Sequence, residues 1–176
     1  MLRDQTGIAS FRDLLVSNLD NQEYLILKSL YTCLTEQCQV CYEEADATSI
    51  RNCGVNYQTV QPPQQVFSHL EGKWRGSATC LDITLFMASC LEKAGVYPLV
   101  VLTARNAQDD VPCHALVGCW KGPHGERPVL RLTTHIAAFR KEVENGRAYA
   151  LECTGITEGE KRLSFESALA SGVKLL

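Results

Sequence analysis

The sequence has no cluster of basic residues and no long apolar run. Its 176 residues include 17 Lys and Arg against 20 Asp and Glu, which gives a formal net charge of −3 at pH 7. A protein that neutralises phosphate backbones needs a basic surface, so we expect no nucleic acid partner. The longest apolar run resembling a strand, residues 97–104, is far shorter than the roughly 20 residues of a membrane-spanning helix. We therefore expect no membrane partner.

The amino-terminal stretch MLRDQTGIASFRDLL also lacks the basic segment, apolar core and small-residue cleavage site of a secretory signal. The nine cysteines are odd in number and irregularly spaced. That usage is typical of reduced thiols rather than of a disulfide framework. Together these observations predict a cytoplasmic protein.

Internal repeats, low-complexity tracts and linkers are missing as well. Hydrophobic residues make up 45% and charged residues 21% of the chain, as in ordinary globular domains. We expect one domain over residues 1–176, with a helical amino-terminal part at 1–53 and a core at 54–176. The truncated look of the final FESALASGVKLL leaves the alternative that the chain is a piece of a longer protein.

The hydrophobic periodicity changes along the chain. Three- and four-residue spacing predicts helices over 7–20 and 21–44, followed by an extended segment at 54–63, a short helix at 64–70 and a loop at 72–77. The second half predicts strands at 97–104, 114–120, 128–132 and 148–154, with helices over 136–144 and from 165 onward. Helices that precede a mostly antiparallel sheet indicate the α+β class.

The stretch RGSATCLDITLFMASCLEKAG (75–95) predicts a helix with a cysteine at its start. Thr79 and Asp82 have the spacing of a capping box, which would place Cys80 in the first turn. There the helix dipole favours an anion and lowers the pKa of a thiol. The apolar residues that follow predict a buried and therefore rigid helix. The alternative is that Cys80 is a packing residue, because free cysteines are commonly buried.

A thiolate nucleophile needs an imidazole partner, and the imidazole needs an acceptor. Among the four histidines, only His114 opens a strand that is predicted to be buried. Glu152 lies in the last strong strand, AYALECT, where a carboxylate is costly unless it is paired. The alternatives are a core histidine at 114 and a solvent-facing glutamate at 152.

Several segments together resemble the transglutaminase-like branch of the papain-like cysteine enzymes, and most closely a bacterial group of transglutaminase-like domains. The matching segments are QTVQPP (58–63), GSATCLDIT (76–84), SCLEKAGVYPLVVLT (89–103), CHALVGCW (113–120) and LECTGIT (151–157). The chain departs from the pattern by two extra residues before Cys80, by Glu152 in place of aspartate, and by a long interval between His114 and Glu152.

The resemblance implies a papain-like fold in which a central helix bearing Cys80 packs on an antiparallel sheet. It implies a cysteine protease or related hydrolase that acts on protein or peptide amides without a cofactor. Cys80 would be the nucleophile, His114 the general base and then acid, and Glu152 the residue that orients the imidazole. Gln58, with the backbone amide of Cys80, would bind the oxyanion, and Trp74 is a rival donor.

Hydrolysis is preferred over cross-linking, because water needs no second binding site, while deamidation stays open. The rival hypothesis is a catalytically silent transglutaminase-like module that binds a partner or belongs to a larger protein. A third arises from the spacing C-x4-C-x2-C-x11-C of Cys33, Cys38, Cys41 and Cys53, which could hold zinc. We expect no metal, because the first three are predicted on one helix, and we expect Cys113 and Cys153 in the core.

Overall fold

The computed structural model describes residues 22–44, 60–62, 66–70, 73–103, 114–121, 136–159 and 162–176. Its helices are α2 (Gln22–Gln37), α5 (Cys80–Lys93), α6 (Ile136–Glu144) and α7 (Phe165–Leu175), with a 3-10 turn, η2, at Cys153–Ile156. The described strands form two three-stranded sheets. This mixture confirms the α+β class. The helix expected at 7–20 and the strand expected at 128–132 lie outside the described residues.

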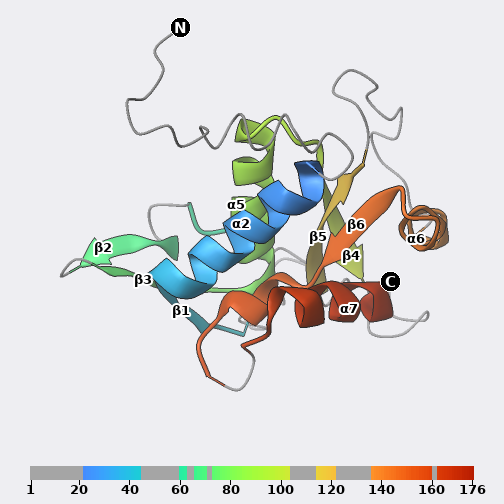
Figure 1. Cartoon of the computed structure of the whole chain (residues 1–176). Helices are drawn as coiled ribbons and strands as arrows, with labels where there is room; N and C mark the ends of the chain where they lie inside the picture. The colour runs from blue at the N-terminus through green and yellow to red at the C-terminus, as the bar shows by residue number, and fades with distance from the viewer. Residues whose placement is uncertain are drawn as a thin grey trace, which may run out of the picture.

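The larger sheet contains β4 (Pro98–Thr103), β5 (His114–Trp120) and β6 (Ala148–Leu151), in that order and antiparallel throughout. Val117 of β5 pairs with Val100 on one side and Leu151 on the other. These strands confirm three of the apolar runs in the sequence, although the last ends three residues earlier than predicted. Figure 1 shows α5 standing between this sheet and the smaller one.

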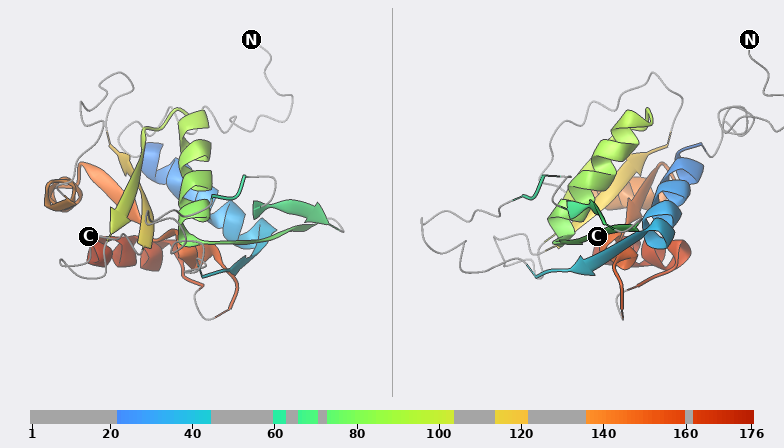
Figure 2. Two further views of the ribbon diagram at one scale, coloured as in Figure 1. Left: turned by 180° about the vertical axis from the view of Figure 1, so that it is seen from behind. Right: turned by 90° about the vertical axis from the view of Figure 1, so that its left-hand side faces the viewer.

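Helix α5 packs against β4 and β5 through a buried stripe along its length. The stripe recurs every three or four residues, as expected for one helix face: Ile83, Thr84, Met87, Ala88 and Leu91. Burying each large apolar side chain contributes roughly 2 kcal/mol. The remaining positions include half-buried Leu85 and Phe86, so α5 is central but has an outer face (Figure 2).

The opposite face of the larger sheet is covered by α6 and the end of α7. A second apolar cluster forms there from Leu116, Phe139, Ala148, Ala150 and Leu176. Helix α7 approaches β6 very closely, since a Cβ added at Gly172 would lie 2.4 Å from the carbonyl oxygen of Ala150. Only glycine fits at that point of the helix, and the close packing holds α7 beside the end of β6.

The smaller sheet corrects three predictions. It contains β1 (Cys38–Tyr42), β3 (Lys73–Ala78) and β2 (Ser68–Leu70), with β1 parallel and β2 antiparallel to β3. The helix predicted over 21–44 therefore ends at Gln37. Strand β2 occupies residues 68–70 of the predicted helix at 64–70, and β3 begins at Lys73 inside the predicted loop at 72–77. A short run such as CQVCY suits a helix or a strand equally, and pairing with β3 decides the outcome.

Among the described residues, no helix combines the length and apolarity that crossing a membrane requires.

Candidate active site

Helix α5 begins at Cys80, and side chains cap its first turn. Thr79 has an extended backbone (φ −79°, ψ 169°), and its Oγ1 accepts a hydrogen bond from the amide of Asp82 at 3.3 Å. The Asp82 carboxylate accepts in return from Thr79 N at 3.0 Å and from Thr79 Oγ1 at 2.8 Å. This geometry confirms the predicted capping box. It makes Cys80 the first helical residue, where the helix dipole favours an anion.

The sulfur of Cys80 and the ring of His114 are hydrogen-bonded to each other, which joins the start of α5 to the start of β5. Since Nε2 of the ring is taken by Glu152, the nitrogen that faces the sulfur is Nδ1. Cys80 is 7% exposed and the His114 side chain 21% exposed. The pair is therefore shielded from bulk water but remains open to solvent beside the ring.

Opposing effects set the pKa values of this pair. Burial raises the pKa of Cys80, but the hydrogen bond and charge of His114, with the amides of Ala115 and Leu81, outweigh it and bring the pKa below its ordinary value. Hydrogen bonds with Cys80 and Glu152 raise the pKa of His114 to about 10, although burial opposes them. Both shifts favour a thiolate and an imidazolium over the neutral pair.

Glu152 follows β6 directly and caps η2. Its Oε2 lies 2.5 Å from Nε2 of His114, while Oε1 accepts from Thr154 N at 2.8 Å and from Thr154 Oγ1 at 2.7 Å. Burial raises the pKa of Glu152. The contacts with His114 and Thr154 lower it by more, so the pKa of Glu152 lies below its ordinary value. The buried carboxylate is therefore charged and held on both oxygens.

Thr154 is a member of this site that the sequence analysis missed. It stands two residues after Glu152, in the position where a capping side chain meets the backbone amide at the start of a turn. That local spacing is a signal in the sequence, but the predicted strand over 148–154 concealed it. The strand ends at Leu151, and the chain then turns to bring Thr154 back onto the carboxylate.

Tyr42 is a second member that the sequence analysis missed. Its hydroxyl is hydrogen-bonded with the sulfur of Cys80. Burial, followed by the charge of Cys80 and this hydrogen bond, raises the pKa of Tyr42 to about 12, so the hydroxyl keeps its proton and is the donor. The helix predicted over 21–44 gave no reason to place Tyr42 here, because the contact depends on strand β1.

Of the two predicted oxyanion donors, one lies outside the described residues and the other belongs to β3. Gln58 lies outside the described residues. The backbone of Trp74 lies in β3 opposite Cys38, four residues before Ala78. Four residues of strand span about 13 Å, and the β2–β3 hairpin extends away from α5 (Figure 2). The backbone amide of Cys80 remains as a donor, because the first amides of a helix have no acceptor within it.

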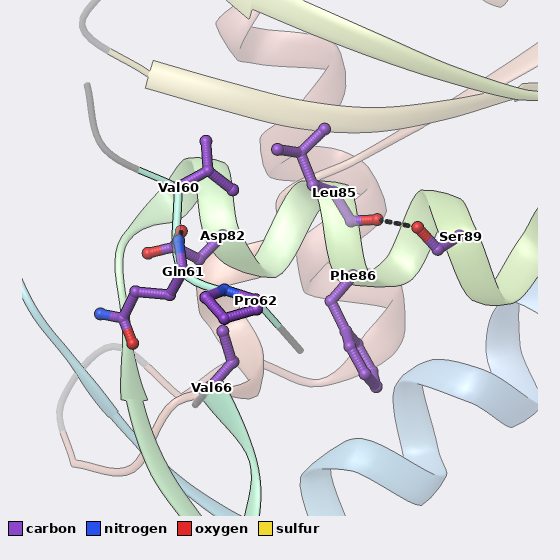
Figure 3. Close-up of a pocket in the computed structure, with 8 residues that line it drawn as sticks. All are labelled: Val60, Gln61, Pro62, Val66, Asp82, Leu85, Phe86 and Ser89. Atoms are coloured by element: carbon purple, nitrogen blue, oxygen red, sulfur yellow. Dashed lines mark hydrogen bonds between the residues drawn. The ribbon is translucent and has the colours of Figure 1, made fainter. Parts of the chain in front are cut away.

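A pocket of about 250 Å³ lies on the outer face of α5 (Figure 3). It is lined by one helix face and the segment beside it: Val60, Gln61, Pro62, Val66, Asp82, Leu85, Phe86 and Ser89. These helix positions lie on the side of α5 opposite the stripe that begins at Cys80. The pocket is thus separate from the Cys80 site, and Asp82, which lines it, accepts a hydrogen bond from Gln61 N at 2.8 Å.

The cysteines considered for zinc are distributed over different elements. Cys33 lies on α2, Cys38 and Cys41 lie on β1, and Cys53 is outside the described residues. The prediction that the first three share one helix is therefore wrong. Within the described ranges, no three His, Cys, Asp or Glu side chains are grouped so that they could hold a metal ion.

The two cysteines expected in the core have different outcomes. Cys153 is 0% exposed, and its thiol donates to the carbonyl of Leu151 at 3.6 Å, so it is a core residue as predicted. Cys113 lies outside the described residues.

Comparisons of this chain with protein-family models, with curated proteins and with solved structures found no match. The geometry of Cys80, His114 and Glu152 therefore indicates what this site can do chemically.

Proposed function

We propose that this chain is a cysteine-dependent acyl-transfer enzyme of the transglutaminase-like type, with the papain-like order of a nucleophile on a helix, a base on a strand and an acid after a later strand. The observation that carries the proposal is the contact of Cys80 with His114, together with the 2.5 Å hydrogen bond from His114 to Glu152. A nucleophile, a base within reach and a group that orients the base form the minimal apparatus of acyl transfer.

The first half of the reaction forms an acyl-enzyme. The thiolate of Cys80 attacks the carbonyl carbon of an amide, and the C–S bond forms as the carbonyl electrons move onto oxygen. When this intermediate collapses, the C–N bond breaks and the imidazolium of His114 gives its proton to the departing nitrogen. The leaving amine is released neutral, and His114 is then a neutral base.

The second half restores the enzyme. His114 takes a proton from water as the water oxygen attacks the thioester carbon, and the thiolate of Cys80 leaves as the carboxylic acid product forms. Glu152 stabilises the imidazolium in both halves without accepting the proton, because its pKa lies below the ordinary value. Water suffices as acceptor, so we favour hydrolysis of protein or peptide amides over cross-linking.

Competitive alkylation of the nine cysteines tests this proposal. Buried Cys80 should react with iodoacetamide at neutral pH on the order of tenfold faster than exposed Cys33 and Cys41, because His114 stabilises the Cys80 thiolate. The rates are measured by mass spectrometry of peptides after short exposures. Since Cys80 is less accessible than the two comparison thiols, faster reaction cannot be an effect of exposure.

Replacement of the imidazole supplies the second arm. In His114→Ala, alkylation of Cys80 should slow to the rate of an ordinary thiol, while Cys33 and Cys41 react as before. Alkylation of Cys80 at or below the rate of Cys33 and Cys41 in the wild type would contradict the proposal and favour the silent module. An acyl group from p-nitrophenyl acetate should also appear on Cys80 and be absent in Cys80→Ser.

A further inference from the structure

Strand β1 holds Tyr42 beside the segment that leads into the nucleophile. The parallel register of β1 with β3 places Tyr42 opposite Ala78, two residues before Cys80. The next amide, that of Glu43, donates to the carbonyl oxygen of Ala78 at 2.9 Å and ties the end of β1 to this segment. Tyr42 is half-buried, so its ring is restrained by packing and its position relative to Cys80 is set by the backbone.

The Cys80 sulfur is surrounded by hydrogen-bond donors. The ring of His114, the amides of Ala115 and Leu81, and the hydroxyl of Tyr42 are all directed at it. An anionic sulfur accepts such bonds readily, whereas a sulfur bonded to an acyl carbon is a weak acceptor. Formation of the C–S bond therefore releases donors that had been satisfied by the thiolate.

We propose that Tyr42 is the side-chain oxyanion donor of this site, whose hydroxyl holds the thiolate in the free protein and passes to the carbonyl oxygen once the C–S bond forms. The inference rests on the proposed function and deepens it. The oxyanion develops on the carbon bonded to the sulfur, so it lies only two bonds from the atom that the hydroxyl already contacts. The backbone amide of Cys80 is the second donor.

No proton is transferred in this step. The hydroxyl of Tyr42 donates a hydrogen bond to the oxyanion and keeps its proton, which returns with the hydroxyl to the sulfur when the thiolate leaves. Such a donor contributes only where negative charge develops on the carbonyl oxygen. It is needed for acylation, and it is not needed for a reaction of the same sulfur that forms no oxyanion.

Tyr42→Phe separates the two kinds of reaction. Iodoacetamide loses iodide from a saturated carbon without forming an oxyanion, whereas p-nitrophenyl acetate must pass through one. The acylation rate, read from p-nitrophenolate release per reactive Cys80, should fall on the order of 100-fold or more. The alkylation rate, compared on the pH-independent plateau of each protein, should change by less than about tenfold, because one hydrogen bond to the thiolate is lost.

Tyr24→Phe is the matched control, since Tyr24 is a half-buried tyrosine of α2 that packs against Tyr149 and Phe165. Both of its rates should equal those of the wild type. The acylation rate is divided by the number of Cys80 sites that react rapidly with iodoacetamide. Only folded molecules are then counted, so partial unfolding of a variant does not obscure the result.

The outcomes distinguish the role assigned to Tyr42 from the proposed function of the site. An unchanged acylation rate in Tyr42→Phe, or acylation and alkylation rates that fall by the same factor, would overturn the assignment of Tyr42 and leave the proposed function intact. Slow alkylation of Cys80 in the wild type would overturn the proposed function and the inference together.

Discussion

Among the individual residues, Glu152 controls the charge state of His114 through its carboxylate. In Glu152→Gln the hydrogen bond can persist but the negative charge is lost, so the pKa of His114 should fall from about 10 by about one to two units. A falling imidazolium pKa moves the alkaline limb of the acylation profile to lower pH. The measurement is the rate of p-nitrophenolate release from about pH 6 to 11, a range that includes the His114 pKa of about 10.

Glu142→Gln is the control for that change, because Glu142 is also paired with a cation, Arg147, at 2.6 Å but lies on α6. Its acylation profile should match the wild type. An alkaline limb in Glu152→Gln that stays where the wild type has it would mean that Glu152 does not act on His114 through its charge.

Thr154 acts through Glu152, so we treat it as a positioning residue. Thr154→Val removes the hydroxyl that donates to Oε1 at 2.7 Å and should lower the free energy of unfolding by about 1–3 kcal/mol. A less restrained carboxylate supports the imidazolium less well, so the pKa of Cys80 should rise and the acid limb of its alkylation profile should move to higher pH. Urea unfolding and the alkylation profile measure the two effects.

The neighbouring hydroxyl of Thr157 provides a comparison for Thr154→Val. It is fully buried and donates to the carbonyl oxygen of Thr154 at 2.7 Å rather than to the carboxylate. Thr157→Val should lose stability by a similar amount while the acid limb of Cys80 alkylation stays in place. An acid limb that moves equally in both variants would reduce the role of Thr154 to general support of the turn.

At the level of elements, α7 determines where the chain turns after β6. The amide of Glu152 donates to the carbonyl of Ala168 at 3.1 Å, and Gly172 allows α7 to lie against Ala150. In Gly172→Ala the new Cβ would lie 2.4 Å from the Ala150 oxygen, so the helix must move away. Overpacking costs about 1–3 kcal/mol, which exceeds or offsets the roughly 1 kcal/mol that alanine contributes to helix propensity.

We therefore expect Gly172→Ala to lower the midpoint of urea unfolding and to slow alkylation of Cys80, because Glu152 moves with the helix. Ser171→Ala, one position earlier on α7 and half-buried, should do neither. A Gly172→Ala protein with wild-type stability and alkylation would show that α7 does not position Glu152.

Elements differ in how well their sequences predicted them. Helix α5 was predicted because its cap, its apolar stripe and its end all agree locally. Strand β1 was predicted as the end of a helix, since Cys38, Val40 and Tyr42 suit either structure until a partner strand is present. Strand β3 was predicted as a loop because it contains small residues. Position 76 requires glycine for a tertiary reason, since a Cβ added there would lie 1.6 Å from the carbonyl oxygen of Val66.

For the whole molecule, the thiolate and imidazolium link stability to pH. When unfolded, the pair loses the His114 proton near its ordinary pKa of 6.5 and the Cys80 proton near 9.0. When folded, the pKa of Cys80 is lower and that of His114 is about 10. The contribution of His114 is fully present below pH 6.5 and is lost as the pH rises toward 10, because the folded protein holds this proton to higher pH. The contribution of Cys80 is present above pH 9.0 and is lost as the pH falls through its lowered folded pKa.

The free energy of unfolding should consequently exceed that of the double variant Cys80→Ser/His114→Gln by an amount that falls between pH 9.0 and about 10, where the unfolded pair has lost both protons and the folded imidazolium still holds its own. Urea titrations under reducing conditions across this range measure the difference directly. A difference that does not vary with pH would contradict the charged pair, because groups with unshifted pKa values contribute no such dependence.

The sequence by itself determined the α+β class, the capped helix that begins at Cys80, and the apolar strands that carry His114 and precede Glu152, because each depends on neighbouring residues and on local periodicity. Only the tertiary structure decided that the three meet, that Thr154 turns back onto the carboxylate, and that Tyr42 reaches the sulfur from a strand. Those contacts join residues up to 38 positions apart in the sequence. They depend on strand register and helix packing, which no local pattern encodes.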